Sequence, residues 1–365
     1  MISYGLTEEQ EVVREAIRDF AEQVLRPLAR ECDEAESIPG DFLDTVWELG
    51  LTSTQIPAAF GGGGEDRSPI TNAIILEELA HGDATLAMAA VAPSAFANAI
   101  VDQGSEQQKQ KYLPLFCGER FHAASLAAIE SAAVSDPMKP RTLAEPKEEG
   151  FVISGSKALV PLGRRASHFL VTARNGEEGV DAFIVPADAE GLTVSDAEKN
   201  LGLRGLGTVS LTLDRVEVPA ADRLGGEQGS DLRRVFDGSR AALAAVMLGL
   251  SRAVLEYCVP YTKDRVAFDE PIAQKQAIAF RLADMHIEIE ATRWLVWKAA
   301  SQLERGLETT RSSHFARSYA AEKSMWIADN GIQTLGGHGF IREHPVEMWF
   351  RNARSLGVLE GTLVL

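Results

Sequence analysis

One carboxylate near the C-terminal end of the sequence is surrounded by apolar residues. Glu360 lies in the stretch "SLGVLEGTLVL", with leucine and valine on both sides. Burying a carboxylate is costly unless an opposite charge pairs with it or a proton neutralises it. Two interpretations are therefore open. Glu360 ends a helix, with Gly361 as the residue after the cap and the side chain in water, or it is a general base whose pKa a dry pocket raises.

Other motifs that could do chemistry are absent from the sequence or lack their context. The three cysteines, Cys32, Cys117 and Cys258, lie far apart with no CxxC spacing, so we expect no metal site and reduced thiols. The glycine run "FGGGGED" at 60–66 has no following Lys-Ser/Thr and no preceding strand, and we interpret it as a flexible connector. The phrases "LGLRGLG" and "GGHGF" lack the βαβ context of a dinucleotide fingerprint.

The composition and charge of the chain restrict its class. Its 365 residues are 45% hydrophobic and 24% charged, typical of a globular protein with two or three packed units. A net charge of −17 argues against nucleic acid or an anionic membrane as partner. "MISYGLTEEQ" is no signal peptide, and the longest apolar run, 241–250, is too short to span a bilayer. We therefore expect a cytoplasmic protein.

The elements that must position Glu360 fall into three blocks. Residues 1–120 show helical periodicity, beginning with a capping box at Thr7 and Gln10. Residues 121–225 contain short β-branched runs bounded by turn residues, which predict a small antiparallel sheet or barrel. Residues 226–365 return to long helical patterns, which predict a four-helix bundle. The fold class is therefore α+β, with an N-terminal helical domain, a middle antiparallel β domain and a C-terminal four-helix bundle.

These blocks carry phrases that resemble the acyl-CoA dehydrogenase family over essentially the whole chain. The phrases are "GSEQQKQKYLP", "LGLRGLGT" leading to "VEVP", "KDRVAF", "QTLGGHGF", "EHPVEMWFRNAR" and "VLEGT". The resemblance implies FAD as cofactor and an acyl-CoA as substrate. It makes Glu360 the catalytic base, which takes the α-proton while hydride leaves the β-carbon for flavin N5, giving a trans-2-enoyl-CoA. In some members the base lies on the helix written here "FDGSR", where this sequence has Ser239.

The resemblance also assigns the other site residues, one position at a time. Phe236, Asp237 and Arg240 match residues that line the pantetheine and the base, and Gly361 follows the base in the substrate site. Arg265, Phe268 and Gln276 match residues that reach the FAD of a neighbouring subunit, and Gln333 and Gly337 match the same adenine-side contact. Thr362 matches a flavin-side contact, and backbone amides near Ala128 and Ser135 serve the flavin pyrimidine edge.

The flavin-side motifs depart from the family pattern. Ile129 and Ser131 replace a threonine and a proline, while Glu130, Ser135 and Asp136 remain. Leu159, Val160 and Pro161 replace an aromatic residue, isoleucine and a hydroxyl residue, and Pro161 also has no N–H. Each lost hydrogen bond weakens flavin binding by about 1 kcal/mol. Asp269 further replaces a glycine, and Leu359 replaces a tyrosine.

The sequence is consistent with several functions. The first is an active enzyme of fatty acid metabolism, a homotetramer that passes electrons to an electron-transfer flavoprotein. The second is an oxidase that reacts with dioxygen. The third is a flavin-poor accessory subunit of a heterotetramer, which completes a homologue's FAD site. A DNA-protecting relative of the same fold would need a basic patch, which the net charge of −17 disfavours. The acyl chain length is not readable from the sequence.

Overall fold

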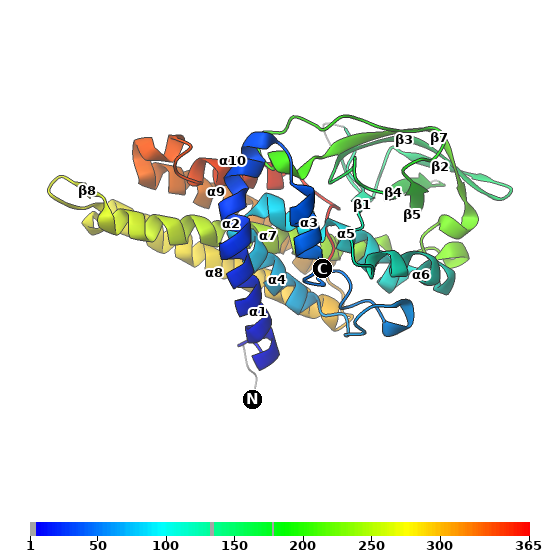
Figure 1. The fold of residues 1–365 in the computed structure, drawn as a ribbon, viewed down its shortest axis with the longest axis horizontal. Helices are drawn as coiled ribbons and strands as arrows, with labels where there is room; N and C mark the ends of the chain where they lie inside the picture. The colour runs from blue at the N-terminus through cyan, green and yellow to red at the C-terminus, as the bar shows by residue number, and fades with distance from the viewer. Residues whose placement is uncertain (1–4, 132–134, 177–178) are drawn as a thin grey trace.

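The computed structural model describes residues 5–131, 135–176 and 179–365. A bundle of long helices forms one end of the molecule and a curved sheet forms the other, with the N-terminal helices packed across the middle (Figure 1). The predicted α+β class with helical, β and helical parts is confirmed.

The first part of the chain is helical. Its elements are α1 (Glu8–Phe20), the π-helical turn η1 (Ala21–Leu25), α2 (Arg26–Ala35), α3 (Gly40–Trp47), η2 (Ala58–Phe60), α4 (Pro69–Gly82), α5 (Ala84–Gln103), α6 (Glu106–Tyr112) and η3 (Leu113–Phe116). Thr7 and Gln10 form the predicted capping box of α1. The break between α5 and α6 falls at Gly104 and Ser105, because Ser105 starts a second capping box.

The glycine run after η2 is not the flexible connector that the sequence predicts. The amides of Gly63 and Gly64 donate to the carbonyls of Ser53 and Ile56, which folds the run back onto the preceding turn. A Cβ atom at Gly62 would lie 2.2 Å from the carbonyl oxygen of Ile56. Glycine is therefore required there for close backbone packing rather than for mobility.

Seven strands form one sheet in the middle of the chain. They are β1 (Ala124–Ala127), β2 (Leu143–Lys147), β3 (Gly150–Val160), β4 (His168–Asn175), β5 (Gly179–Pro186), β6 (Leu192–Val194) and β7 (Val209–Pro219). The order is β1-β4-β2-β3-β7-β6, with β5 paired to β4. Most pairs are antiparallel as predicted, but β4 runs parallel to both β1 and β2. The loop between β1 and β2 thus begins and ends beside β4.

The last part of the chain is the helical bundle. It comprises α7 (Leu232–Asp264), the hairpin of β8 (Val266–Ala267) and β9 (Glu270–Pro271), η7 (Ile272–Gln274), α8 (Gln276–Glu304), α9 (Thr310–Leu335), η8 (Gly336–Phe340) and α10 (Val346–Leu356). Pro260 lies inside α7, which continues to Asp264. Small residues let α7 approach α4 closely, since a Cβ at Gly249 would lie 2.1 Å from the Glu77 carbonyl oxygen.

Two helices, α5 and α7, are long and apolar enough to span a membrane by length and composition alone. In each, the most apolar window is largely covered by other parts of the chain, to 94% in α5 and 78% in α7. Their apolar side chains belong to the core of the structure, where α7 is the central helix of the bundle (Figure 1).

Candidate active site

The segment that carries Glu360 leaves the bundle and enters the junction of the three parts of the chain. Helix α10 ends at Leu356, four residues before Glu360, so Gly361 is not the residue that caps this helix. Gly361 has a φ of +63°, and a Cβ there would lie 2.5 Å from the Cβ of Ala128 and 3.0 Å from the Phe236 ring. The C-terminus accordingly lies in the centre of the molecule (Figure 1).

Polar contacts hold the residues after Glu360 in place. The Leu365 amide donates to the Gly238 carbonyl at 3.3 Å, and the Asn98 side chain donates to the Val364 carbonyl at 3.0 Å. Asn98 belongs to α5 and Gly238 to α7, so the end of the chain is fixed between these two helices.

The Glu360 carboxylate lies at the end of a series of side chains joined by hydrogen bonds. Arg240 donates from Nε to Glu360 Oε1 at 2.7 Å, and its Nη1 lies 3.4 Å from Asp237 Oδ1. Asp237 is buried and accepts from the hydroxyls of Ser313 and Thr310, at 2.8 Å each. The Glu360 side chain is 23% exposed. The carboxylate is thus paired, rather than isolated in an apolar pocket.

A second arginine holds the backbone before Glu360. Arg317 of α9 is buried, and its Nη2 donates to the carbonyls of Leu356 at 3.3 Å, Gly357 at 3.0 Å and Leu359 at 2.6 Å. Burial lowers the pKa of the Arg317 guanidinium, an effect that Glu360 opposes. One side chain therefore fixes the path of the turn that presents the carboxylate.

The flavin-side positions lie next to this turn. The Thr362 hydroxyl is buried and finds no partner among the described residues, and the same holds for Ser239. The Ala158 amide donates to the Ile129 carbonyl at 2.9 Å, which places the two altered flavin motifs side by side. The unpaired buried hydroxyl of Thr362 fits a polar planar cofactor beside this turn, although Pro161 offers no N–H to it.

A buried ion pair fixes the loop that leaves β1. Lys157 Nζ lies 3.0 Å from Glu130 Oε1, with the side chains 0% and 8% exposed. Glu130 also accepts from the amides of Arg141 and Thr142, at 2.7 and 2.9 Å. Burial lowers the pKa of Lys157 to about 8. Burial raises the pKa of Glu130, but the Lys157 charge and these donors outweigh it, so the net shift is downward. The Ser135 hydroxyl accepts from the Glu130 amide at 3.0 Å.

The five predicted adenine-side residues belong to segments distant in sequence from Glu360, namely the end of α7, the β8–β9 hairpin, the start of α8, the end of α9 and η8. The hairpin forms the tip of the bundle (Figure 1). The five residues are Arg265, Phe268, Gln276, Gln333 and Gly337, and all five are exposed. Tyr261 near the end of α7 donates to the Leu335 carbonyl at the end of α9, which brings the two groups of positions together. Phe268 and Asp269 both have positive φ values, 55° and 67°, a backbone conformation that is strained for residues other than glycine.

Sequence reasoning missed Thr310, Ser313 and Arg317, all on α9. The available signal was one arginine on the buried stripe of small residues formed by Ser313, Ala316, Ala320 and Ser324. A charge on such a stripe needs buried acceptors, and here they are backbone carbonyls of a distant segment. No group of three or more potential metal ligands occurs in the described part of the chain.

Comparisons with known proteins agree with this architecture. Three family models match: "Acyl-CoA dehydrogenase, N-terminal domain" over residues 7–120, the middle domain over 125–216 and the C-terminal domain over 230–363. An acyl-CoA dehydrogenase of Bacillus subtilis (strain 168) is 33% identical, covering 98% of this chain and 95% of the relative.

Two solved structures extend the comparison. Butyryl-CoA dehydrogenase from Megasphaera elsdenii has a TM-score of 0.89 at 30% identity, covering 97% of this chain and 95% of that one. A prolyl acyl carrier protein oxidase has a TM-score of 0.87 at 27% identity, covering 96% and 95%.

Together the three family models cover the N-terminal helical part, the middle β domain and the C-terminal helical bundle. This chain belongs to the acyl-CoA dehydrogenase family. It is an oxidoreductase that acts on acyl-CoA, and the cofactor of the family is FAD.

Proposed function

We propose that Glu360 removes the α-proton of an acyl-CoA in an α,β-dehydrogenation that yields a trans-2-enoyl-CoA. The observation that carries this proposal is the hydrogen-bonded series from Ser313 and Thr310 through Asp237 and Arg240 to the Glu360 carboxylate. A general base must be held in one orientation within reach of its proton. No carboxylate is present at the alternative family position, because Ser239 occupies it.

The chain's own residues have separable tasks in this reaction. Arg240 orients Glu360 in the resting chain and must release it for proton transfer. Phe236 and Gly361 form the wall against which the thioester lies. The Glu360 backbone amide donates to the thioester carbonyl as charge develops on its oxygen. The Thr362 hydroxyl and the backbone near Ala128 and Ser135 hold the flavin, which supplies the acceptor for the β-hydride.

The assembly is part of the proposal. Arg265, Phe268, Gln276, Gln333 and Gly337 are exposed, and none of them belongs to the segment that carries Glu360. We assign them to the FAD of a neighbouring subunit in a homotetramer. An electron-transfer flavoprotein is the proposed electron acceptor, and the oxidase reaction with dioxygen is the alternative. The three free cysteines support a cytoplasmic setting. Fatty acid metabolism is the proposed pathway.

The decisive measurement is a visible spectrum of the chain expressed alone, with flavin counted per polypeptide after denaturation. We expect about one flavin per chain, bleached by members of a panel of acyl-CoAs. Glu360→Gln keeps the shape of the side chain but cannot take a proton. It should retain the flavin and slow bleaching by about 10²- to 10⁴-fold. Glu343→Gln, an exposed glutamate outside the site, is the matched control.

One observation favours a second candidate, the accessory subunit. Pro161 and Leu159 stand where flavin contacts are expected, whereas the adenine-side positions are kept. A colourless chain that takes up no added FAD, and that restores flavin to a homologous subunit, would replace the first proposal with this one. A coloured chain whose Glu360→Gln variant bleaches at the normal rate would move the base elsewhere.

A further inference from the structure

Ser239 is a buried polar residue beside the candidate base, and the proposed reaction gives it no task. Its side chain is 0% exposed, and its hydroxyl finds no hydrogen-bond partner among the described residues. Of the buried serines and threonines in the described part of the chain, only Ser239 and Thr362 are in this state. The proposed function assigns Thr362 to the flavin. The Ser239 hydroxyl therefore still needs a partner.

Other buried hydroxyls of the bundle are satisfied by their own helices. Ser251, also on α7, is 3% exposed and donates to the Met247 carbonyl four residues earlier, at 2.7 Å. Thr292 of α8 and Thr334 of α9 make the same kind of bond, each at 2.7 Å. A helical serine can always turn to this carbonyl, but Ser239 does not. Its hydroxyl is thus available to a group that is not part of the helix.

Ser239 lies on the turn of α7 that meets the segment of the catalytic base. One residue of this turn is Phe236, and a Cβ atom at Gly361 would lie 3.0 Å from its ring. Another is Arg240, which donates to Glu360 at 2.7 Å. Residues three apart share one face of a helix, so Ser239 follows Phe236 on the face that meets this segment. A thioester with its α-carbon at Glu360 therefore has its first acyl carbons next to this turn.

The face of α7 that carries Ser239 is otherwise apolar. Phe236 comes one turn before it and Leu243 one turn after it, and both are 0% exposed. A hydrocarbon chain packed on this face would leave the hydroxyl unpaired, which costs free energy. A polar atom in the acyl group would remove that cost.

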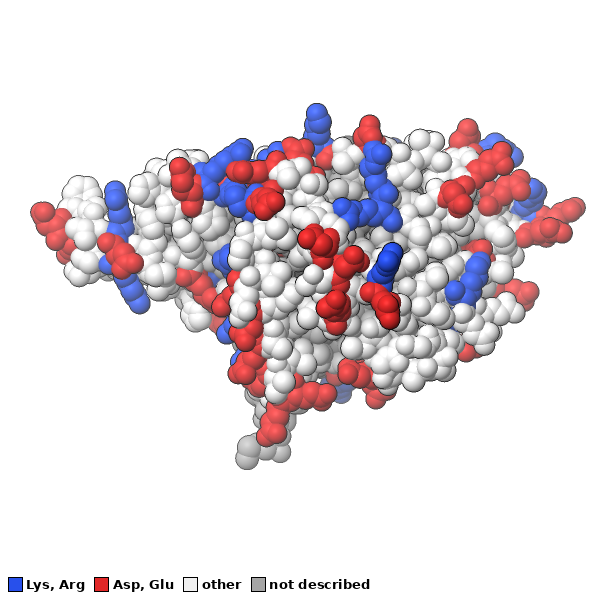
Figure 2. All heavy atoms as spheres, in the orientation of Figure 1, with Lys and Arg blue, Asp and Glu red and all other residues white. Residues whose placement is uncertain are grey.

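The charges near Ser239 favour a neutral polar atom over a carboxylate. Arg240 is engaged by Asp237 and Glu360, and Arg317 by three backbone carbonyls. A carboxylate on the acyl group would lie near two anions, with both arginines already engaged. On the outside of the molecule, by contrast, acidic and basic side chains are mixed over the face in Figure 2, where water solvates them.

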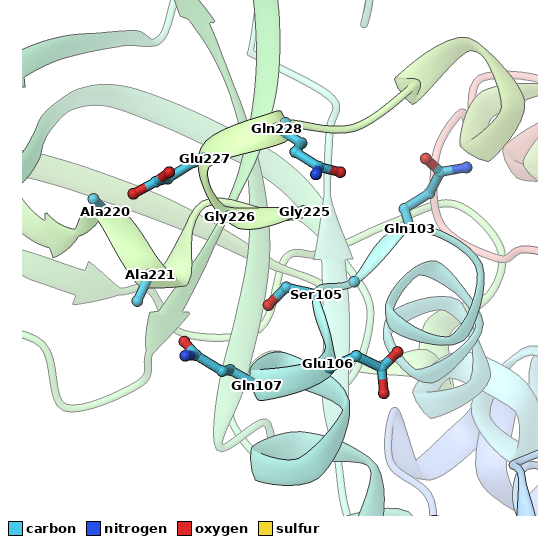
Figure 3. A pocket seen from close by; sticks show the side chains of 12 residues that line it. Gln103, Ser105, Glu106, Gln107, Ala220, Ala221, Gly225, Gly226, Glu227 and Gln228 are labelled. Atoms are coloured by element: carbon cyan, nitrogen blue, oxygen red, sulfur yellow. The ribbon is translucent and has the colours of Figure 1, made fainter.

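An open hollow elsewhere on the molecule is a weaker indication of a ligand. It has a volume of about 810 Å³ and lies between the α5–α6 junction and the glycine turn at 225–229 (Figure 3). Water can bond the exposed polar side chains around it, which are those of Glu106, Gln107, Glu227 and Gln228. The Ser239 hydroxyl is buried, so only a group that enters the site can pair with it.

We propose that Ser239 selects acyl groups that carry a neutral hydrogen-bonding substituent, such as a hydroxyl, one or two carbons beyond the bond that is oxidised. The proposal rests on the proposed function, because that function places the acyl group between Glu360 and α7. Release of Glu360 from Arg240 opens this face to the acyl group. A serine hydroxyl both donates and accepts hydrogen bonds. A site that must pair a buried hydroxyl rejects an apolar group of the same shape.

The first test needs neither substrate nor turnover. Ser239→Ala removes a hydroxyl that has no partner in the chain, so the melting temperature without added thioester should rise by about 1–2 °C. Ser251→Ala is the matched control on the same helix, because it removes a hydroxyl that is already bonded to the Met247 carbonyl. It should not raise the melting temperature. A Ser239→Ala variant that melts below the wild type would mean that the hydroxyl is paired within the chain, which contradicts the proposal.

The second test measures binding of reaction products, which the oxidised holoenzyme cannot turn over. Calorimetry compares 4-hydroxy-2-butenoyl-CoA with 2-pentenoyl-CoA, and 5-hydroxy-2-pentenoyl-CoA with 2-hexenoyl-CoA, so that a methyl group replaces the hydroxyl in each pair. In at least one pair the wild type should bind the hydroxylated ligand about tenfold more tightly. Ser239→Ala should lose this preference, Ser239→Thr should keep part of it, and Ser251→Ala should keep all of it.

The other outcomes of this test separate the alternatives. Equal binding within both pairs, or a preference that survives in Ser239→Ala, would overturn the proposal. Weaker binding of all four ligands to Ser239→Ala by the same factor would assign the hydroxyl to the thioester, and loss of flavin would assign it to the cofactor. A wild-type holoenzyme that binds none of the four ligands would refute the proposed function, and this inference with it.

Discussion

The Glu360 carboxylate is positioned from two directions, by Arg240 at its side chain and by Arg317 at the preceding backbone. The contact to Arg240 follows from the family resemblance, because both residues lie in quoted motifs. The contact to Arg317 does not, since residue 317 meets the 356–359 segment only through the packing of α9 against α10. Sequence patterns locate chemical groups, but they do not reveal which distant carbonyls a buried arginine will cap.

We predict that Arg317→Met lowers kcat by tenfold or more while changing KM little. Losing three carbonyl contacts lets the Glu360 turn shift, and a displacement of about 1 Å can cost on the order of 10²-fold in rate. Arg317→Lys keeps the charge and one donor nitrogen on a shorter reach, so it should recover part of kcat. The measurement is steady-state kinetics with the best acyl-CoA, together with exchange of the substrate α-proton into D₂O.

Arg311→Met serves as the control for this pair of variants, because Arg311 is an exposed arginine at the start of the same helix. A purely structural role for Arg317 would show as a lower melting temperature with kcat, KM and α-proton exchange unchanged. That result would contradict the positioning role.

At the scale of elements, the Lys157–Glu130 pair holds the β1–β2 loop against β3 and β4. Lys157 also contacts the Ala128 carbonyl at 3.4 Å and the Thr172 hydroxyl at 3.3 Å. The sequence predicted the short strands of this domain, and it showed that Glu130 matches the family pattern. The sequence did not predict that Lys157 is the partner of Glu130, or that β4 pairs in parallel with β1 and β2. Both depend on which non-adjacent strands meet.

Breaking this ion pair should destabilise the protein in a pH-dependent way. Lys157→Met leaves a buried carboxylate unpaired, which costs about 3–5 kcal/mol near pH 7. In the wild type the folded-state pKa of Glu130 is depressed, so its stabilisation is present above the unfolded value and is lost as pH falls through the folded one. In the variant Glu130 can instead protonate, so the penalty should shrink at pH 5. Urea unfolding at both pH values measures it.

Two further variants test the cause of that penalty. Lys157→Met/Glu130→Gln removes the uncompensated charge and should regain part of the lost stability. Lys147→Met breaks an exposed pair with Glu217 and should leave the free energy of unfolding nearly unchanged. A Lys157→Met penalty that is the same at both pH values would mean that the unpaired carboxylate is not its origin.

At the scale of the whole molecule, the bundle presents an apolar stripe that the single chain leaves uncovered. Phe280, Ile287 and Trp294 of α8 are 60%, 61% and 47% exposed, and their spacing of seven places them on one face. Phe268 of the adjoining hairpin is 88% exposed. Exposed apolar surface of this kind marks protein contacts, and it runs along α8 from the end of the helix that adjoins the hairpin.

Ile287→Glu should therefore dissociate the assembly and release flavin from the chain. A carboxylate in the middle of an apolar contact cannot be buried without a partner, so we expect a smaller species in size-exclusion chromatography with light scattering. If each FAD needs adenine-side residues from a neighbour, flavin per chain should fall in the same fractions. Val12→Glu introduces the same charge at an exposed apolar position on α1 and should alter neither property. An Ile287→Glu variant with the wild-type mass and full flavin would place the subunit contact elsewhere, whereas a monomer that keeps its flavin would show that each chain completes its own FAD site.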